Sequence, residues 1–255
     1  MKVEELNYDL PKEFIAQKPL DKRDDSKLLI LDRATGKVEH SKFAKLPEFL
    51  RKGDLLVLNN TKVLPARIFT KRKTGGKVEV LILANTIRDA KCEALLGTPR
   101  RLKVGEAIFT DGNAEIKIVE KLMQGRWLLE FSGNVFDIMC SCGVPPLPPY
   151  IKRDATKGDF ERYQTIYAQN DGSIAAPTAG LHFTKELLNK LETKYITLHV
   201  GLGTFSPVEV EDLSAHKMLE EGYQISDEVA SSIKKAKQEN RRIVAVGTTT
   251  VRALE

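Results

Sequence analysis

The run DLLVLNNT at residues 54–61 decides how this chain is organised. Four apolar residues in succession, bounded by polar ones, are typical of a buried strand. The strand closes on the polar cluster Asn59, Asn60 and Thr61, and α/β proteins place ligand contacts at strand ends of this kind. The run therefore predicts an α/β fold with polar side chains gathered at the end of a buried strand.

The same alternation of helix and strand resumes after residue 150. Thr184 is a good N-cap for a helix over residues 185–192, and a strand is expected over 195–200. Ser226 caps an amphipathic helix over 227–239, and a strand over 242–246 ends on GTTTVR. The first helix passes into its strand with almost no connection, where two to six residues are usual. One explanation is that residues are missing near Lys194 and Tyr195.

Residues 68–143 differ in character from the segments around them. Short alternating runs are separated by turn signals such as Gly75-Gly76 and Asp111-Gly112, a spacing typical of a small antiparallel sheet or barrel. The stiff run PPLPPY at 145–150 leads back out. We therefore expect a discontinuous large α/β domain over 1–67 and 144–255, with an inserted β-barrel-like domain over 68–143.

Composition limits the class of protein. The chain has 255 residues, 42% hydrophobic and 29% charged, as in soluble globular proteins. No apolar run is long enough to span a bilayer, and residues 1–14 lack the features of a secretory signal. Cys92, Cys140 and Cys142 lack paired metal-ligand spacing, so we expect reduced thiols in a cytoplasmic protein and no metal site. The net charge of +5 permits nucleic-acid binding through a local patch without requiring it.

Two loops have a composition that helices and strands do not need: GSIAAPTAGLHF at 172–183 and TLHVGLGTF at 197–205. Glycine lets a backbone approach a ligand closely, and histidine titrates near neutral pH. His182 follows a small-residue loop, which favours a functional role over a hydrogen-bonded structural one. His199 lies within an apolar strand, so a satisfied core histidine is the stronger alternative there.

Three further segments each have a functional and a structural interpretation. GTTTVR at 247–252 resembles an anion-binding turn, or is simply a helix start capped by threonine. RYQTIY at 162–167 suits stacking on and pairing with a base, or is an amphipathic strand. Basic clusters at 71–73 and 100–103 suit phosphate contact, or are solvated charge.

Taken together, these motifs resemble one family, the S-adenosylmethionine:tRNA ribosyltransferase-isomerases of queuosine biosynthesis. The resemblance runs along the whole chain. It rests on YDLP (8–11), IAQ (15–17), RD (23–24), GDLLVLNNT (53–61), PAR (65–67), PLPPYI (146–151), RYQT (162–165), residues 175–183, LHVG (198–201), GTF (203–205) and residues 246–252. The sequence departs from the family at Asn60, where many members carry Asp, at Ser206 and at Leu219. Members of the family also continue beyond residue 255 with a C-terminal segment that this chain lacks.

The resemblance implies that the ribosyl part of S-adenosylmethionine is transferred to 7-aminomethyl-7-deazaguanine at the wobble position of a tRNA and isomerised. The product is epoxyqueuosine, and adenine and methionine are released. S-adenosylmethionine is then a consumed substrate, no cofactor is needed, and the partners are tRNA and S-adenosylmethionine. A monomer is expected. A non-catalytic RNA-binding protein and an S-adenosylmethionine-dependent RNA methyltransferase are the alternatives.

The resemblance also implies roles for individual residues. His182 and His199 are the expected proton-transfer residues, since histidine acts as acid or base near neutral pH. The remaining substrate-binding candidates are Asn60, Thr61, Arg67, Tyr163, Gln164, Pro177, Thr178, Gly180, Gly201, Gly203, Thr204, Thr248, Thr249 and Arg252, and the tRNA-binding candidates are Lys71, Arg72, Arg100 and Arg101.

Overall fold

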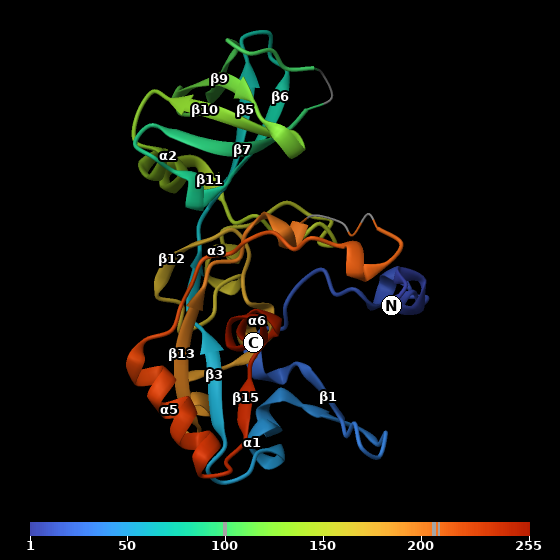
Figure 1. Ribbon diagram of the computed structural model, residues 1–255. Helices are drawn as coiled ribbons and strands as arrows, with labels where there is room; N and C mark the ends of the chain where they lie inside the picture. The colour runs from blue at the N-terminus through green and yellow to red at the C-terminus, as the bar shows by residue number, and fades with distance from the viewer. Residues whose placement is uncertain (99–100, 206–207, 209) are drawn as a thin grey trace.

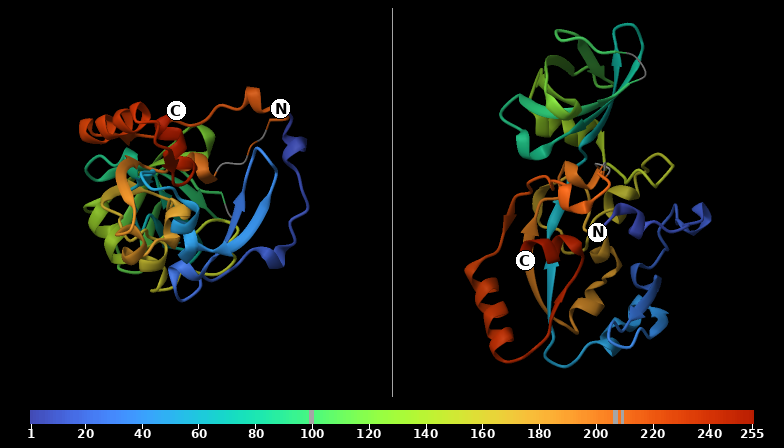
Figure 2. Two further views of the ribbon diagram at one scale, coloured as in Figure 1. Left: turned by 90° about the horizontal axis from the view of Figure 1, so that it is seen from below. Right: turned by 45° about the vertical axis from the view of Figure 1, so that its right-hand side comes forward.

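The molecule has two lobes joined by a narrow waist (Figure 1). The structure is a computed structural model, and it describes residues 1–98, 101–205, 208 and 210–255. A β-barrel forms one lobe, and a sheet flanked by helices and loops forms the other, which contains the C-terminus (Figures 1 and 2). This arrangement confirms the predicted α/β fold with an antiparallel β-barrel.

The sheet of the α/β lobe is built around β3 (Leu55–Asn59), all five residues of which are buried. It has the order β14-β13-β3-β15. Strands β13 (Glu192–Leu198) and β15 (Ile243–Ala245) run parallel to β3, and the edge strand β14 (Tyr223–Gln224) runs antiparallel to β13. Residues 55–59 of the run at 54–61 therefore form a central strand of a mainly parallel sheet, which explains why this strand has no polar alternation.

Alternate residues of β3 face two apolar clusters. Val57 packs on one face with Val229 of α5 (Asp227–Gln238) and Ala253 of α6 (Thr248–Leu254). Leu56 and Leu58 pack on the other face with Phe43, Phe183 and Leu187. Short elements pack against this second cluster through Leu28 of β1 (Lys27–Leu31), Leu46 of α1 (Leu46–Phe49) and Leu187 and Leu188 of α4 (Lys185–Leu188). The lobe also contains β2 (Val38–Lys42) and α3 (Asp159–Arg162).

The barrel lobe is a closed antiparallel sheet. Its strands are β5 (Arg67–Arg72), β6 (Lys77–Ile82), β7 (Lys91–Gly97), β8 (Ala107–Thr110), β9 (Glu115–Lys121) and β10 (Arg126–Phe131), and pairing of β5 with β8 closes the ring. Helix α2 (Val135–Cys142) begins at Asn134, whose side chain accepts the Asp137 N–H, and it buries Val135 and Met139 in the barrel core.

The chain enters and leaves the barrel through neighbouring strands. Arg67 of β5 pairs with Val144 of β11 (Gly143–Val144) at the waist. Gly143 is needed there because a Cβ at this position would lie 1.9 Å from the Pro65 carbonyl oxygen. Strands β4 (Thr61–Val63) and β12 (Asn170–Ser173) form a short parallel pair on the α/β side of this crossing. The division at residues 67/68 and 143/144 stays a prediction.

The predicted helix over 185–192 is too long. Helix α4 ends at Leu188, and β13 begins at Glu192, which pairs with Leu55. Thr184 does cap the helix, since its hydroxyl accepts the Leu187 N–H at 3.3 Å. Pairing of residues 192–196 with β3 replaces the helical turn that propensity favoured, so the connection between helix and strand has an ordinary length.

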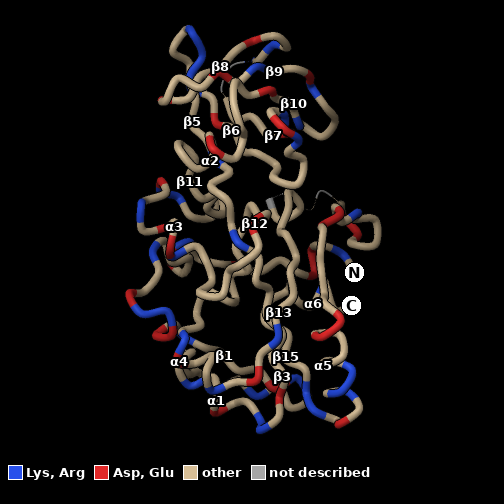
Figure 3. Tube along the Cα trace, turned by 90° about the vertical axis from the view of Figure 1, so that its left-hand side faces the viewer, with Lys and Arg blue, Asp and Glu red and all other residues tan. Residues whose placement is uncertain are grey.

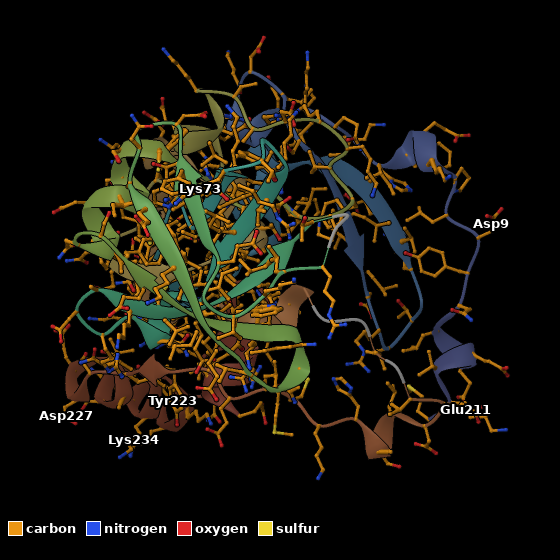
Figure 4. The ribbon with its side chains drawn as sticks, turned by 90° about the horizontal axis from the view of Figure 1, so that it is seen from above. Asp9, Lys73, Glu211, Tyr223, Asp227 and Lys234 are labelled. Carbon is orange, nitrogen blue, oxygen red and sulfur yellow. The ribbon has the colours of Figure 1, made fainter. Side chains whose placement is uncertain are left out.

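The termini lie on the α/β side of the waist. The N-terminal segment pairs with residues 211–213, where the Val3 N–H donates to the Glu211 carbonyl at 2.9 Å. Figure 4 accordingly shows Asp9 and Glu211 on the same edge of the molecule, away from Asp227 and Lys234 of α5. Helix α5 has 12 residues, and among the described residues no helix has the length and hydropathy to cross a membrane.

Candidate functional site

Three neighbouring cavities lie near the waist. The central cavity, of about 380 Å³, is walled by residues 148–150, 175–179 and 247–249, together with Tyr163, Val200 and Thr204. These segments are the connector after the barrel and the loops that follow the strands of the α/β lobe. The predicted site loops 172–183, 197–205 and 247–252 therefore meet in space.

The flanking cavities each contain one of the two predicted histidines. His199 lines a cavity of about 350 Å³ between residues 83–86 of the barrel and residues 219–222 of the α/β lobe. His182 lines a cavity of about 300 Å³ with residues 16–19, Arg153 and Arg162. The central cavity shares Val200 with the first and Tyr163 and Thr178 with the second. The two histidines therefore stand at opposite ends of one row of cavities.

His199 is held by a chain of hydroxyl groups. Its Nδ1 lies 2.9 Å from Thr61 Oγ1, and Thr61 Oγ1 lies 2.8 Å from Ser173 Oγ. Gly172 packs against the imidazole, because a Cβ at Gly172 would lie 2.7 Å from His199 Nδ1. Burial lowers the pKa of His199, and the negative charge of Asp171 opposes this. The ring is thus neutral near neutral pH.

His182 ends the 3₁₀ helix η7 (Thr178–His182) and stacks at a tilt on Phe43, with ring centroids 5.2 Å apart. Its Nδ1 lies 3.0 Å from Ser26 Oγ. Burial lowers its pKa, a hydrogen bond with the Arg23 backbone raises it, and the Arg162 and Arg23 charges lower it further. The helix that follows, α4, has only four residues, and burial is the first cause of the lowered pKa.

Tyr163 lies between the central cavity and the His182 cavity, and only 7% of it is exposed. Its hydroxyl lies near the Ala176 backbone but makes no hydrogen bond to any residue that the structure describes. Burial raises the pKa of Tyr163 to about 12, so the hydroxyl stays protonated. A buried hydroxyl without a partner costs free energy, and a polar ligand in either cavity would supply one.

Several predicted contact residues are instead engaged with the protein. Gln164 accepts the Val63 N–H at 3.0 Å and donates to the Val63 carbonyl at 2.7 Å, so its amide extends the pairing of β4. Asn60 Oδ1 accepts from Thr197 at 2.7 Å and from Asn170 at 3.2 Å. Gly180 makes room for Tyr167, whose hydroxyl would lie 2.0 Å from a Cβ at that position.

The wall of the His199 cavity contains Glu221, whose buried carboxylate pairs with the exposed Arg252. Glu221 accepts the Gly201 N–H at 2.8 Å and pairs with Arg252 at 2.5 Å, and Arg252 also donates to the Leu219 carbonyl. Arg252 therefore holds residues 219–221 in place. Gly203 lies against Leu219, outside the lining of the three cavities.

The remaining predicted substrate contacts lie around the central cavity. Thr248 and Thr249 begin α6 on its wall, and Thr204, Pro177 and Thr178 face it from the other loops. Thr249 is also tied to the sheet, because Asn59 Nδ2 lies 3.2 Å from its hydroxyl oxygen.

The predicted basic residues lie on the barrel lobe or at its neck. Lys71 forms an ion pair with Asp111 at 2.9 Å, Arg72 with Glu106 at 3.1 Å, and Arg67 with Glu79 at 2.9 Å. Arg100 lies outside the described residues. Over both lobes, Lys and Arg are interspersed with Asp and Glu (Figure 3).

Arg101 lines a separate cavity of about 580 Å³ on the barrel, together with Lys103, Lys121 and Trp127. The Lys121 ammonium lies 5.7 Å from the centre of the indole ring. Cations beside an aromatic ring suit phosphate and base contact. Among the described residues, no group of three or more His, Cys, Asp and Glu side chains gathers to hold a metal ion.

Sequence reasoning missed Ser26, Gly172 and Ser173 as individual contributors to the site. Gly172 and Ser173 stand in the loop quoted above, and a Gly-Ser pair just before small residues was a usable signal. Ser26 gave none, because it reaches His182 across 156 positions of sequence.

Comparison with known proteins finds similarity to one family along the whole chain. The model of a family described as "Queuosine biosynthesis protein" matches residues 3–255. The chain is 49% identical to the S-adenosylmethionine:tRNA ribosyltransferase-isomerase of Carboxydothermus hydrogenoformans, over all of this chain and 77% of that protein. It is 47% identical to the protein of the same name from Acetivibrio thermocellus, over all of this chain and 76% of that one. Among solved structures, S-adenosylmethionine tRNA ribosyltransferase from Thermotoga maritima is similar at 30% identity and a TM-score of 0.45, over 98% of this chain and 72% of that one.

Proposed function

Because the chain belongs to the queuosine biosynthesis protein family, we propose that it acts as an S-adenosylmethionine:tRNA ribosyltransferase-isomerase. The identity of 47–49% to proteins of that name extends over all of the chain. It is an enzyme of tRNA modification, as the resemblance in its sequence predicted.

In detail, the enzyme transfers the ribosyl part of S-adenosylmethionine to 7-aminomethyl-7-deazaguanine at the tRNA wobble position and isomerises it to the epoxycyclopentane of epoxyqueuosine. S-adenosylmethionine is consumed as a substrate, and adenine and methionine leave. A base removes a proton beside the sulfonium, which acidifies it, and hydrogen-bond donation assists the departure of adenine. The enzyme works as a cytoplasmic monomer and needs no cofactor.

The Tyr163 hydroxyl, which has no hydrogen-bond partner among the described residues, is the observation that carries the location of the site. It stands between the His182 cavity and the central cavity, and the wall of the central cavity holds the small-residue loop 175–179 and the threonines of α6. S-adenosylmethionine occupies the central cavity, where Ala175, Ala176 and Ala179 leave room for a bulky ligand. Tyr163→Phe should weaken substrate binding severalfold while leaving the free energy of unfolding unchanged or higher, since the lost hydroxyl has no hydrogen-bond partner among the described residues. Tyr223→Phe, at an exposed position, is the matched control.

The reaction is tested with S-adenosylmethionine labelled in its adenine and methionine parts, incubated with tRNA that carries 7-aminomethyl-7-deazaguanine. Release of both parts, with modified tRNA, is the expected result. Release of S-adenosylhomocysteine would identify a methyltransferase instead. No turnover, with tRNA binding retained, would favour the non-catalytic RNA-binding alternative.

The barrel supplies the tRNA contact in this proposal. Lys71 and Arg72 are paired with carboxylates, whereas Arg101, Lys103 and Lys121 surround the Trp127 cavity. Reversal of Arg101 and Lys103 to Glu should weaken tRNA binding and reduce its salt dependence, with S-adenosylmethionine binding retained. Reversal of Lys71 should have a smaller effect. Equal loss of both ligands would point to misfolding.

A further inference from the structure

The hydrogen bonds around His199 define where its ring proton lies. Ser173 is fully buried, and its Oγ already accepts the Val200 N–H at 2.7 Å. Among the hydrogen bonds described, Thr61 Oγ1 is the acceptor within reach of the Ser173 hydroxyl proton. Thr61 accepts from Ser173 and still has its own hydroxyl proton to donate. The acceptor within reach is His199 Nδ1 at 2.9 Å. Nδ1 is therefore an acceptor, and the proton of the neutral ring is on Nε2.

The reverse direction of donation is less favourable. If Nδ1–H donated to Thr61 and Thr61 donated to Ser173, the Ser173 proton would have no acceptor among the described residues. An unsatisfied buried hydroxyl is destabilising, because it gives up its hydrogen bonds to water and gains none in the protein. Thr61 is fully buried as well, so water does not reach this chain of hydroxyls.

The hydrogen bonds around His182 lead to the opposite result. Ser26 Oγ donates its single proton to the Arg23 carbonyl at 3.2 Å. The contact of 3.0 Å between Ser26 Oγ and His182 Nδ1 is then satisfied only if the ring donates through Nδ1–H. The lone pair of the neutral ring is on Nε2, the nitrogen left for a ligand in the His182 cavity.

We propose that these hydroxyls hold the two histidines in opposite tautomers: His182 presents an unprotonated Nε2, and His199 presents an Nε2–H donor. Thr61, Ser173 and Ser26 are positioning residues. The assignment rests on the proposed function and adds to it a division of labour. His182 is the base, whose Nε2 lone pair takes the proton beside the sulfonium while the C–H electron pair stays on that carbon. His199 donates a hydrogen bond and takes no proton.

Both rings must be neutral for this distinction to exist, and the surrounding charges act on both. Asp171 faces His199, and Arg126, Glu220 and Glu221 lie on the same cavity wall. Arg23, Arg162 and Glu161 act on the surroundings of His182, and Lys18, Arg153 and Asp159 share its cavity. Glu221 and Asp159 are each neutralised by an arginine. Burial is the first cause of the lowered pKa at both histidines, so both are neutral near pH 8.

Nuclear magnetic resonance tests the tautomers without any turnover. Protein labelled with ¹⁵N-histidine is recorded at pH 8 by two-bond ¹H–¹⁵N correlation, and His→Gln variants assign the rings. The expected result is an Nε2–H pattern for His199 and an Nδ1–H pattern for His182, with exposed His40 as the reference for an unconstrained ring. Nδ1–H at His199 or Nε2–H at His182 overturns the proposal. The readout distinguishes this failure from failure of the proposed function, which labelled S-adenosylmethionine tests.

Variants of the positioning residues test whether their hydroxyl groups determine the tautomers of His182 and His199. Thr61→Val and Ser173→Ala should remove the single Nε2–H pattern of His199, and Thr61→Ser should restore it, because the hydroxyl returns. Ser26→Ala should do the same to the Nδ1–H pattern of His182 and leave His199 unchanged. If Thr61→Val does not fold, Ser173→Ala and Thr61→Ser still decide the matter. An unaltered His199 pattern in folded Ser173→Ala contradicts the proposed direction of donation.

Discussion

The two histidine loops have similar compositions, yet the protein treats their histidines in opposite ways. His182 is reached by a serine from the N-terminal segment, whose own proton is used on a carbonyl. His199 is contacted by Thr61 at the start of β4, and the hydroxyl of Thr61 donates its proton to the imidazole ring. The difference teaches that the chemical role of a histidine depends on which hydroxyl approaches it, and on what that hydroxyl has already bonded.

Replacing His182 should lower kcat more than any other change proposed here. A small effect would contradict the distinct roles assigned to His182 and His199. His182→Gln keeps a polar side chain of similar reach and removes the lone pair that accepts a proton. Loss of a general base typically costs about a hundred- to ten-thousand-fold in rate. We expect kcat to fall by that factor, with S-adenosylmethionine and tRNA still bound. Turnover within a few-fold of the wild type would make His182 a structural histidine.

Replacing His199 should have a smaller effect that depends on the substituent. His199→Phe removes the Nε2–H donor, and a hydrogen bond of about 1–3 kcal/mol corresponds to about a 5- to 160-fold loss of kcat. His199→Gln returns an N–H at the reach of Nε2 and should recover part of the loss. Steady-state kinetics of both variants, with His40→Gln as the control, measure this. Equal loss in the Phe and Gln variants would argue against a donor role.

Gly172→Ala tests the two histidines separately, because the added methyl group would contact His199 and leave the surroundings of His182 unchanged. Gly172 has φ of +149°, and an added Cβ would meet the imidazole at 2.7 Å. We expect a loss of about 1–3 kcal/mol in the free energy of unfolding, together with a change in the His199 resonances alone. Chemical denaturation measures the first. Gly112→Ala, where a Cβ would have ordinary contacts, is the control and should change little.

The smallest expected effect is on pH-dependent stability. In the folded protein the pKa values of His182 and His199 both lie below the ordinary value of 6.5. At a pH between the folded value and 6.5, each histidine is therefore protonated more in the unfolded chain than in the folded protein. The free energy of unfolding should therefore fall as pH is lowered through 6.5 and level off below the folded pKa values. Denaturation curves from pH 8 to pH 5 measure this slope. His182→Gln and His199→Gln should each flatten it, and a slope unchanged in both would show that neither pKa is lowered by folding.

Much of the fold could be predicted from the sequence, because it depends on local patterns. The run at 54–61 contains the central strand, residues 55–59, and the turn signals after residue 68 lie between strands of the barrel. The family could be predicted as well, since its motifs are contiguous in the chain. The boundary of α4 could not, because pairing of Glu192 with Leu55 overrides local helix propensity.

In the candidate site, too, some features depend on local sequence patterns and others on tertiary contacts. The chain alone identified the loops that meet at the central cavity, since each carries glycine, threonine or histidine after a strand. Only the folded molecule decided that Gln164 bonds to Val63, that Arg252 pairs with Glu221, and that Ser26 and Ser173 stand beside the histidines. Gln164 and Val63 are 101 positions apart in the sequence, Ser26 and His182 are 156 apart, and Arg252 and Glu221 are 31 apart. The direction of such hydrogen bonds depends on burial and on the partners already satisfied, which no local sequence pattern records.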